Sequence, residues 1–191
     1  MNLIFLLLTY FLSWQQPVND RLSTRVQWTE QSPMPASEVV YFSSDKKLKW
    51  NDFKGQPVEG RAAAITVSGF GYRARVNTAN PDHQLIIQVY CYFNKNKSWV
   101  KPGRTTDYIL SHEQQHFNIS YIAAKVFQDK LNEADFTLSN YNTLLPQLYN
   151  ESCAIMNKMQ DDYDGETKNG QLRDRQEHWN SFVDDALTGV K

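Results

Sequence analysis

The sequence predicts an α+β fold in which an N-terminal antiparallel sheet is followed by three helices. Segments rich in β-branched and aromatic residues, with alternating apolar positions, come first along the chain, and apolar residues at helical spacing dominate its second half. Strands followed by helices are typical of α+β proteins. A chain of 191 residues, 41% of them apolar, is long enough for one domain with a substantial core.

The N-terminal segment is interpreted as a targeting signal outside the fold. Residues 3–14 form an apolar run that is too short to span a bilayer and close in length to the core of a signal peptide. No lysine or arginine precedes this run, and no Ala-x-Ala cleavage site directly follows it. Residues 1–16 are therefore expected to be a signal peptide or an uncleaved N-terminal anchor. Either predicts an exported protein of the periplasm, the cell surface or the extracellular space.

Residues 17–38 are predicted to be a linker, because they are polar, contain prolines and show no sustained periodicity. The domain is then expected to span residues 39–191. Its first strand is predicted at residues 39–42. A bulged strand at residues 62–76 and an alternating strand at residues 83–93 follow, and a turn between them predicts a hairpin.

A His-Glu-x-x-His motif lies within the longest helix that the sequence predicts, at residues 106–132. His112 and His116 lie one turn apart on one helix face, so both imidazoles can reach the same metal ion, and Glu113 lies between them. This spacing is typical of zincin metallopeptidases, in which the histidines bind Zn²⁺ and the glutamate is the general base toward the attacking water. Apolar residues around most of the helix predict that it is buried, and a metal would offset the desolvation of its polar groups.

Two further helices are predicted at residues 143–161 and 172–187, from apolar stripes at helical spacing. Pro146 is expected in the first turn of the earlier one, where a proline removes no intrahelical hydrogen bond. The turn-rich residues 163–170 are predicted to form a loop between these two helices.

The net charge limits the classes of partner that are expected, and the two cysteines suggest a disulfide. A formal net charge of −1 offers no field that would attract nucleic acid, so no nucleic-acid partner is expected. A polypeptide substrate is compatible with this charge, membrane contact is expected only if the N-terminal segment is uncleaved, and a monomer is expected. Cys91 and Cys153 are expected to form a disulfide if the protein is exported.

Several motifs taken together resemble a known family. The longer ones are Leu48-x-Trp50-x-Asp52-Phe53-x-Gly55-x-Pro57, Leu110-x-His112-Glu113-Gln114-x-His116-Phe117 and Tyr163-Asp164-x-x-Thr167, and the shorter ones are Ala64-x-Thr66, Ser98-Trp99 and Gln176-x-x-Trp179. Through them, most of the chain from Leu48 onward resembles the bacterial secreted zinc-dependent proteases filed as domain of unknown function 922. The resemblance implies a zinc metallopeptidase; it does not identify the substrate.

A catalytic zinc site usually has three protein ligands, and the motif supplies two of them. The remaining candidates are Asp164, Glu151, Glu166 and His178. Asp164 is ranked first, because the predicted loop can fold over the motif helix and a carboxylate is an acceptable zinc ligand. The resembling family commonly has histidine at the position of Asn169. If that histidine is a ligand this chain has lost it, and if the aspartate is the ligand the site is intact.

The leading hypothesis is an exported zinc-dependent metalloendopeptidase. Its expected zinc ligands are His112, His116 and Asp164. Glu113 is expected to act as general base, and Tyr163 to stabilise the oxyanion. The alternative is a non-catalytic peptide-binding or structural domain that retains the fold, and a weaker one is a zinc hydrolase acting on a non-peptide amide.

Overall fold

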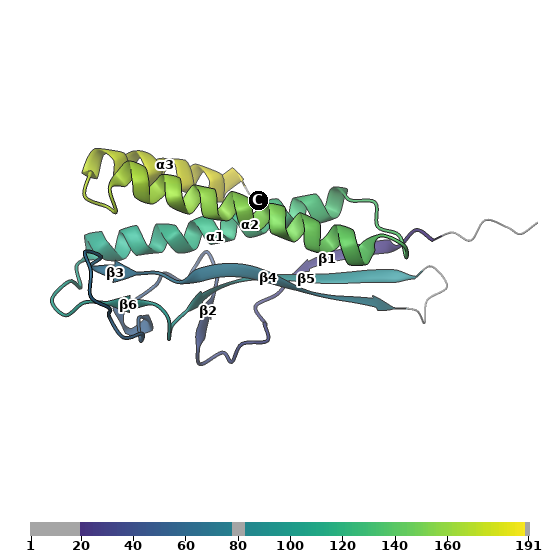
Figure 1. Ribbon diagram of the computed structural model, residues 1–191, viewed down its shortest axis with the longest axis horizontal. Coiled ribbons are helices and arrows are strands. Elements are labelled where there is room, and N and C mark those ends of the chain that lie inside the picture. The colour runs from purple at the N-terminus through teal and green to yellow at the C-terminus, as the bar shows by residue number, and fades with distance from the viewer. Residues whose placement is uncertain (1–19, 78–82, 190–191) are drawn as a thin grey trace, which may run out of the picture.

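The computed structural model describes residues 20–77 and 83–189. The segment interpreted as a signal peptide or anchor, residues 1–16, lies outside these ranges. Among the described residues, no helix is both long and apolar enough to cross a membrane. Strands form one layer and helices the other, so the fold is α+β as predicted (Figure 1).

A four-stranded sheet carries the fold. Its central strand β5 (Gln84–Asn94) pairs along almost its whole length with antiparallel β4 (Ser68–Asn77). The opposite edge of β5 is shared by β1 (Ser23–Trp28), which is parallel to it, and β2 (Val39–Tyr41), which is antiparallel. The alternation predicted for this strand is confirmed, because its inward residues are at most 1% exposed: Leu85, Ile87, Val89, Cys91 and Phe93.

The predicted linker at residues 17–38 is wrong in part, because it contains β1. Thr24, Val26 and Trp28 of β1 face inward between more polar neighbours, but six residues give only a weak alternation. The partner strand is also distant in sequence, since Ser23 pairs with Gln84. Local periodicity carries no signal of such a pairing. The parallel contact makes the sheet mixed, where a purely antiparallel sheet was predicted.

A second, two-stranded sheet lies beside the first and is important for the site. It consists of β3 (Ala64–Ile65) and β6 (Trp99–Val100), which are antiparallel. Both strands come from the connections that flank the β4–β5 hairpin. They place residues 60–68 next to the motif helix, because Thr66 Oγ1 donates a hydrogen bond of 3.2 Å to the Glu113 carbonyl.

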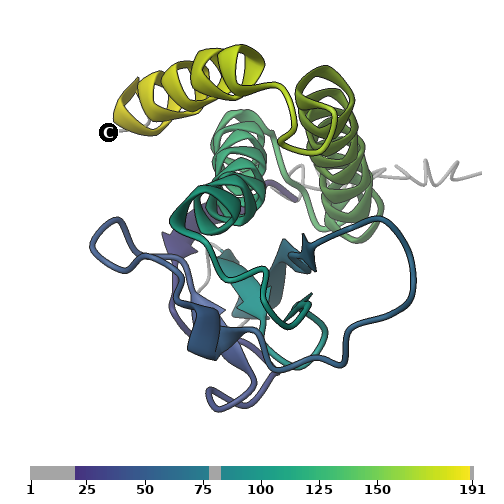
Figure 2. The same cartoon turned by 90° about the vertical axis from the view of Figure 1, so that its left-hand side faces the viewer.

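Three helices form the second layer. α1 (Asp107–Glu133) begins after Thr106, whose side chain accepts a hydrogen bond from the Ile109 N–H, and its bounds match the prediction to within about a residue. α2 (Tyr141–Thr167) and α3 (Arg173–Gly189) follow. Figure 2 shows α1 between the sheet and the other two helices. This position explains the apolar residues around most of α1, which packs on the sheet on one side and on α2 and α3 on the other.

The end of α2 differs from the prediction and matters for the site. The helix continues to Thr167, so Tyr163 and Asp164 lie on its last turns and not in the loop predicted at residues 163–170. Tyr163 and Thr167 are both fully buried and lie one turn apart, and Thr167 Oγ1 donates a hydrogen bond of 2.7 Å to the Tyr163 carbonyl. Tertiary packing of these two residues therefore overrides the turn-forming composition of the segment.

A left-handed turn ends α2. Lys168, Asn169 and Gly170 have φ of 49°, 53° and 75°, a conformation that glycine adopts without strain. A Cβ on Gly170 would lie 3.1 Å from His112 Nδ1, so a side chain here would press on the imidazole as well as strain the turn. Farther back, Pro146 lies inside α2, beyond the first turn in which it was predicted.

The predicted disulfide is not formed, because both cysteines are free thiols. Cys91 lies in the apolar core between the sheet and the helices, and burial raises the pKa of its thiol well above its usual value. Cys153 on α2 is half-buried and hydrogen-bonded to Tyr149. Both thiols therefore have packing or hydrogen-bonding roles that need no covalent link.

Candidate metal centre

Three side chains from two helices converge near the N-terminal end of α1. His112 and His116 project from one face of α1, and Asp164 comes from the last turns of α2. Asp164 Oδ1 lies 3.3 Å from His112 Nε2 and 3.2 Å from His116 Nε2. One potential ligand atom of each residue lies within 4.8 Å of the other two, so the group could hold a metal ion.

Two glutamine side chains fix the orientation of the imidazoles. His112 Nδ1 lies 2.8 Å from Gln176 Oε1, and His116 Nδ1 is hydrogen-bonded to Gln160 Oε1. An amide oxygen only accepts hydrogen bonds, so each Nδ1 must carry the proton. In the neutral imidazole this leaves a lone pair on Nε2, and both lone pairs are available to a metal.

The amide orientations are themselves fixed by other bonds. Gln176 Nε2 donates to the Tyr163 hydroxyl at 2.6 Å and to Asn180 Oδ1 at 2.9 Å. Gln160 Nε2 donates to the His116 carbonyl at 2.8 Å. Turning either amide over would place its oxygen against the Asn180 Oδ1 or the His116 carbonyl, neither of which can donate, and those bonds would be lost. The histidine tautomers therefore follow from the surrounding contacts.

Two carboxylate oxygens at this place are buried without a hydrogen-bond partner among the described residues, Asp164 Oδ1 and Glu113 Oε2. A buried oxygen that carries negative charge is costly unless a donor or a cation satisfies it. Two imidazole lone pairs and a carboxylate oxygen that face one another need a proton or a metal between them. The residues present therefore fit a cation.

In the absence of metal, protons can lie between the two imidazoles and the Asp164 carboxylate. Burial alone would lower the pKa of His116, but contact with Asp164 and the charges of Asp164 and Glu113 raise it above its ordinary value of 6.5. Burial would likewise raise the pKa of Asp164, but the two histidines hold the pKa of that carboxyl well below its usual range. The centre thus favours an ionised carboxylate at neutral pH, which is the form that binds metals.

Glu113 lies where a general base would be useful. Its side chain is only 4% exposed, yet it lines a cleft of about 830 Å³ together with His112 and His116. One wall of this cleft is formed by residues 60–68, including β3, and the opposite wall by α1 and α2. We call His112, His116 and Asp164 the metal group. The unpartnered Glu113 Oε2 is therefore next to the metal group and beside a space large enough for a peptide segment.

Tyr163 does not occupy the position expected for an oxyanion stabiliser. Its side chain is fully buried beneath the histidines, and its ring stacks on that of His112 with centroids 4.7 Å apart. Its hydroxyl donates a hydrogen bond of 3.2 Å to the His112 carbonyl and accepts one from Gln176. Both hydroxyl interactions point into the protein, so the structure places Tyr163 as a support for the imidazole.

The other candidates for the third ligand lie away from the histidines. Glu151 forms an ion pair with Lys130 at 2.7 Å on an exposed surface. Glu166 Oε2 accepts a hydrogen bond of 2.9 Å from Trp179 Nε1, and His178 is exposed on α3. Asn169 lines the cleft but is not in the metal group. Of the proposed ligands, only Asp164 joins His112 and His116.

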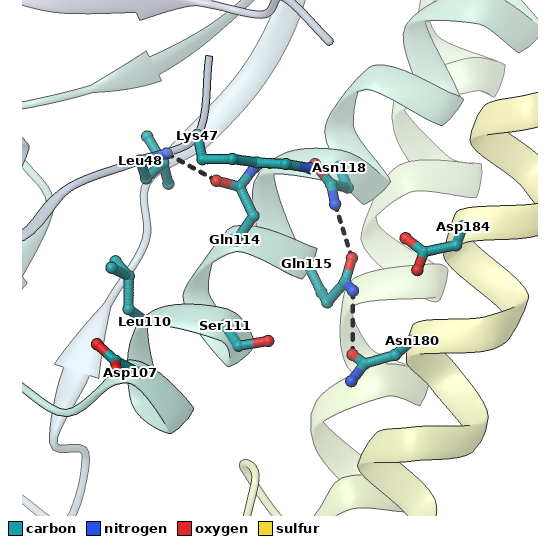
Figure 3. Close-up of a pocket in the computed structure, with 10 residues that line it drawn as sticks. All are labelled: Lys47, Leu48, Asp107, Leu110, Ser111, Gln114, Gln115, Asn118, Asn180 and Asp184. Carbon is teal, nitrogen blue, oxygen red and sulfur yellow. Dashed lines mark hydrogen bonds between the residues drawn. The ribbon is translucent and has the colours of Figure 1, made fainter. Parts of the chain in front are cut away.

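Gln160 and Gln176 are functional candidates that the sequence reasoning missed. Glutamine is not a usual zinc ligand, so neither stood out as a site residue, although Gln176 belongs to one of the quoted motifs. Gln176 also starts a chain of side-chain amides that crosses α1 to a smaller cavity of about 380 Å³. Figure 3 shows the far part of this chain, which runs through Asn180, Gln115, Asn118 and Gln114 to the Leu48 N–H.

Comparison of the chain with protein-family models, with curated proteins and with solved structures finds no match. The resemblance to the zinc-dependent protease family therefore stays a prediction. The geometry of His112, His116, Asp164 and Glu113 supports a function independently of it.

Proposed function

We propose that the chain is an exported zinc-dependent metalloendopeptidase. One observation carries the proposal: two glutamine-oriented imidazoles and a carboxylate converge in a cleft next to a buried, unpartnered glutamate. Two histidines and one carboxylate are a donor set that catalytic zinc sites use, with the fourth position left open. The site residues His112, His116 and Asp164 would hold the metal.

Zinc, when bound, would act as a Lewis acid toward water and the scissile carbonyl. Glu113 would accept the proton of the attacking water, because its Oε2 is buried without another partner beside the cleft. Protonated Glu113 would then deliver that proton to the leaving amine. Gln160 and Gln176 would keep each histidine in the tautomer that leaves Nε2 free.

The edge of β3 would receive the substrate backbone. The Lys101 N–H donates to the Ala63 carbonyl at 2.9 Å, so Ala63 faces β6 in the antiparallel ladder. Backbone groups alternate in direction along a strand, which turns those of Ala64 toward the opposite edge. Because Ala64 lines the cleft, an extended peptide could pair with that edge beside Glu113.

A Glu113→Gln variant tests the proposal. The purified protein is expected to contain about one zinc per chain by mass spectrometry, and to cleave a denatured protein such as casein. Glu113→Gln keeps the shape of the side chain and is expected to retain zinc while hydrolysis falls by about 100-fold or more. Glu133→Gln, at the exposed end of the same helix, is the matched control and should keep both.

The outcomes separate the competing functions. Zinc at full occupancy without hydrolysis of any peptide or protein by the unmodified chain would favour the non-catalytic peptide-binding or structural domain. Iron in place of zinc would overturn the choice of metal, because two histidines and a carboxylate also bind iron. Full zinc occupancy in a His112→Ala, His116→Ala double variant would rule out this site altogether.

A further inference from the structure

The cleft has three cationic side chains at one end and none at the other. Arg61, Lys101 and Arg104 line it, where the loops before β3 and after β6 meet. A backbone hydrogen bond of 2.9 Å from the Lys101 N–H to the Ala63 carbonyl joins the two loops, and one of 3.1 Å from the Arg104 N–H to the Lys101 carbonyl closes a turn within the second. We call this part of the cleft, defined by Arg61, Lys101 and Arg104, the basic end.

The charges of the basic end are not neutralised within the described chain. None of the three cations forms an ion pair with a carboxylate of the described residues, and Lys101 Nζ instead donates a hydrogen bond of 2.6 Å to the Gly60 carbonyl. Asp107, the nearest acidic residue along the chain from Arg104, lines the smaller cavity and not the cleft. The start of α1 adds a partial positive charge at the same place.

The position of the basic end relative to the metal group follows from the contacts along α1. The Thr66 hydroxyl is hydrogen-bonded to the Glu113 carbonyl, and the Ser68 hydroxyl to that of Ser120 at 2.8 Å. Residues 60–68 therefore run along α1 from the basic end past the two histidines. The start of α1 lies roughly 10 Å along the helix axis from the midpoint between the histidines, at about 1.5 Å per residue. An extended peptide covers that distance in about three residues.

We propose that the basic end binds a carboxylate of the substrate, about three residues from the cleaved bond, so that the preferred substrates are anionic peptides. This inference rests on the proposed peptidase function and adds a substrate class to it. The carboxylates of the metal group do not compete, because Asp164 faces the two histidines and Glu113 is buried beside them. Three unpaired cations around one end of a cleft attract anions and disfavour cationic side chains.

Paired peptides test the proposal. Quenched fluorescent alanine-rich peptides, each with one Asp at a different position, are compared with the same peptides carrying Asn, using the zinc-loaded protein at low salt. The kcat/KM ratio of Asp to Asn peptides is expected to reach about fivefold at one position and to shrink in high salt, because exposed ion pairs are screened. A ratio near one at every position, together with no preference for a free C-terminus in the peptides described below, would overturn the proposal.

Variants assign the effect to the basic end. An Arg61→Gln, Arg104→Gln double variant is expected to bring the Asp to Asn ratio close to one. Lys54→Gln is the matched control, since Lys54 is an exposed cation that does not line the cleft, and it should keep the ratio. An undiminished ratio in the double variant would show that the preference arises elsewhere and would overturn the proposal.

A second pair of peptides distinguishes the two sources of a carboxylate. Peptides with a free C-terminus three residues from the cleaved bond are compared with their C-terminal amides. A preference for the free acid alone assigns the basic end to the peptide terminus, and a preference for internal Asp assigns it to acidic side chains. Either preference supports a carboxylate site, and the absence of both contradicts it.

Failure of the peptidase function can be told apart from failure of this inference. If no peptide is cleaved, binding of the Asp and Asn peptides to the Glu113→Gln protein is measured by fluorescence anisotropy. Tighter binding of the Asp peptide, lost in the added Arg61→Gln, Arg104→Gln background, would support the basic end and refute only the peptidase. Equal binding of the Asp and Asn peptides, and of the free acid and its amide, would refute the basic end. Cleavage without a preference for either carboxylate would refute the basic end alone.

Discussion

Asp164 supplies the negative charge of the candidate metal centre, and replacing it by asparagine isolates that charge. Asp164→Asn keeps the size of the side chain, but an amide oxygen is a poor zinc ligand beside two neutral imidazoles. Zinc affinity is expected to fall by about 100-fold or more, measured by competition with a chromogenic chelator. Asn169→Ala, which changes a cleft residue outside the metal group, should leave the affinity nearly unchanged. Unaltered affinity in Asp164→Asn would contradict the assignment.

The histidine–aspartate contacts also predict how the folding stability of the metal-free and zinc-bound protein depends on pH. The pKa of His116 is raised in the folded state, so the stability that its proton contributes is present below its ordinary pKa of 6.5 and is lost as pH rises through the raised value. The pKa of Asp164 is lowered, so its contribution is present above its ordinary value of 3.8 and is lost only in strong acid.

Zinc competes with the proton on Nε2, so the Tm of the metal-free protein and the increase in Tm caused by zinc should change with pH in opposite directions. Between about pH 6 and pH 8, the Tm of the metal-free protein is expected to fall, and the increase in Tm caused by excess zinc is expected to grow. Differential scanning calorimetry with and without zinc checks both trends. Asp164→Asn is the control and should weaken the pH dependence of both quantities. A zinc-induced increase in Tm that becomes smaller as pH rises would argue against imidazole ligands.

At the scale of residues, the sequence located much of the centre because its chemistry is local. Helical spacing alone places His112 and His116 on one face, and the need for a third ligand directed attention to Asp164. The role expected for Tyr163 failed for a different reason. Whether a tyrosine hydroxyl faces a cleft or the core depends on packing between α1, α2 and α3, and no local pattern encodes that packing.

At the scale of elements, α3 contacts His112 of the candidate metal centre through the side-chain amide of Gln176. Gln176 holds His112 Nδ1 and, through Tyr163 and Asn180, ties α3 to α1 and α2. Gln176→Ala is expected to weaken zinc binding by about 10-fold, in the range that loss of a hydrogen bond to a metal-ligating histidine usually costs. Gln176→Glu retains an acceptor for Nδ1 and should recover most of the affinity.

A matched control for this prediction lies on the same helix. His178→Ala removes an exposed imidazole that was a candidate ligand, and it should leave zinc affinity unchanged. Both affinities can be measured by chelator competition, with far-ultraviolet circular dichroism to show that the helices remain. Equal affinities in Gln176→Ala and the unmodified protein would show that Gln176 does not position His112.

The accuracy of the predicted elements follows their local signals. α1 was predicted to within about a residue, because a cap and a long apolar pattern mark it. The end of α2 was placed too early, because the segment with Gly165 and its acidic neighbours has the composition of a turn. Burial of Tyr163 and Thr167 against other helices extends α2, and this contact exists only once the domain has folded.

At the scale of the whole molecule, β1 is expected to be part of the stable domain. Leu22, just before β1, is 4% exposed, its N–H donates to the Phe136 carbonyl at 2.8 Å, and Trp28 packs edge-to-face on Tyr121. A protein that begins at residue 39 should lose about 3–5 kcal/mol of unfolding free energy relative to one that begins at residue 20. Urea denaturation measures the difference. Equal midpoints would restore the linker prediction.

The fold class was predictable from the order of the strands and helices, whereas the edges of the domain were not. The strong alternation of β5 identifies a central strand from sequence alone. The position of β1 beside it depends on a parallel pairing between distant segments. The same holds for the cleft, whose walls come from residues 60–68 and from two helices far along the chain.

The metal group joins helices that are separated by a long stretch of chain, and this has a mechanical consequence. A zinc ion bound by His116 and Asp164 would be a reversible cross-link that closes a loop of about 48 residues containing the α1–α2 connection. By the chain-entropy relation for cross-links, a closure of that length stabilises a fold by up to about 4 kcal/mol. Free zinc concentration would then set how firmly the two helices are held together, so the ion proposed to equip the cleft for hydrolysis would also protect the protein from unfolding.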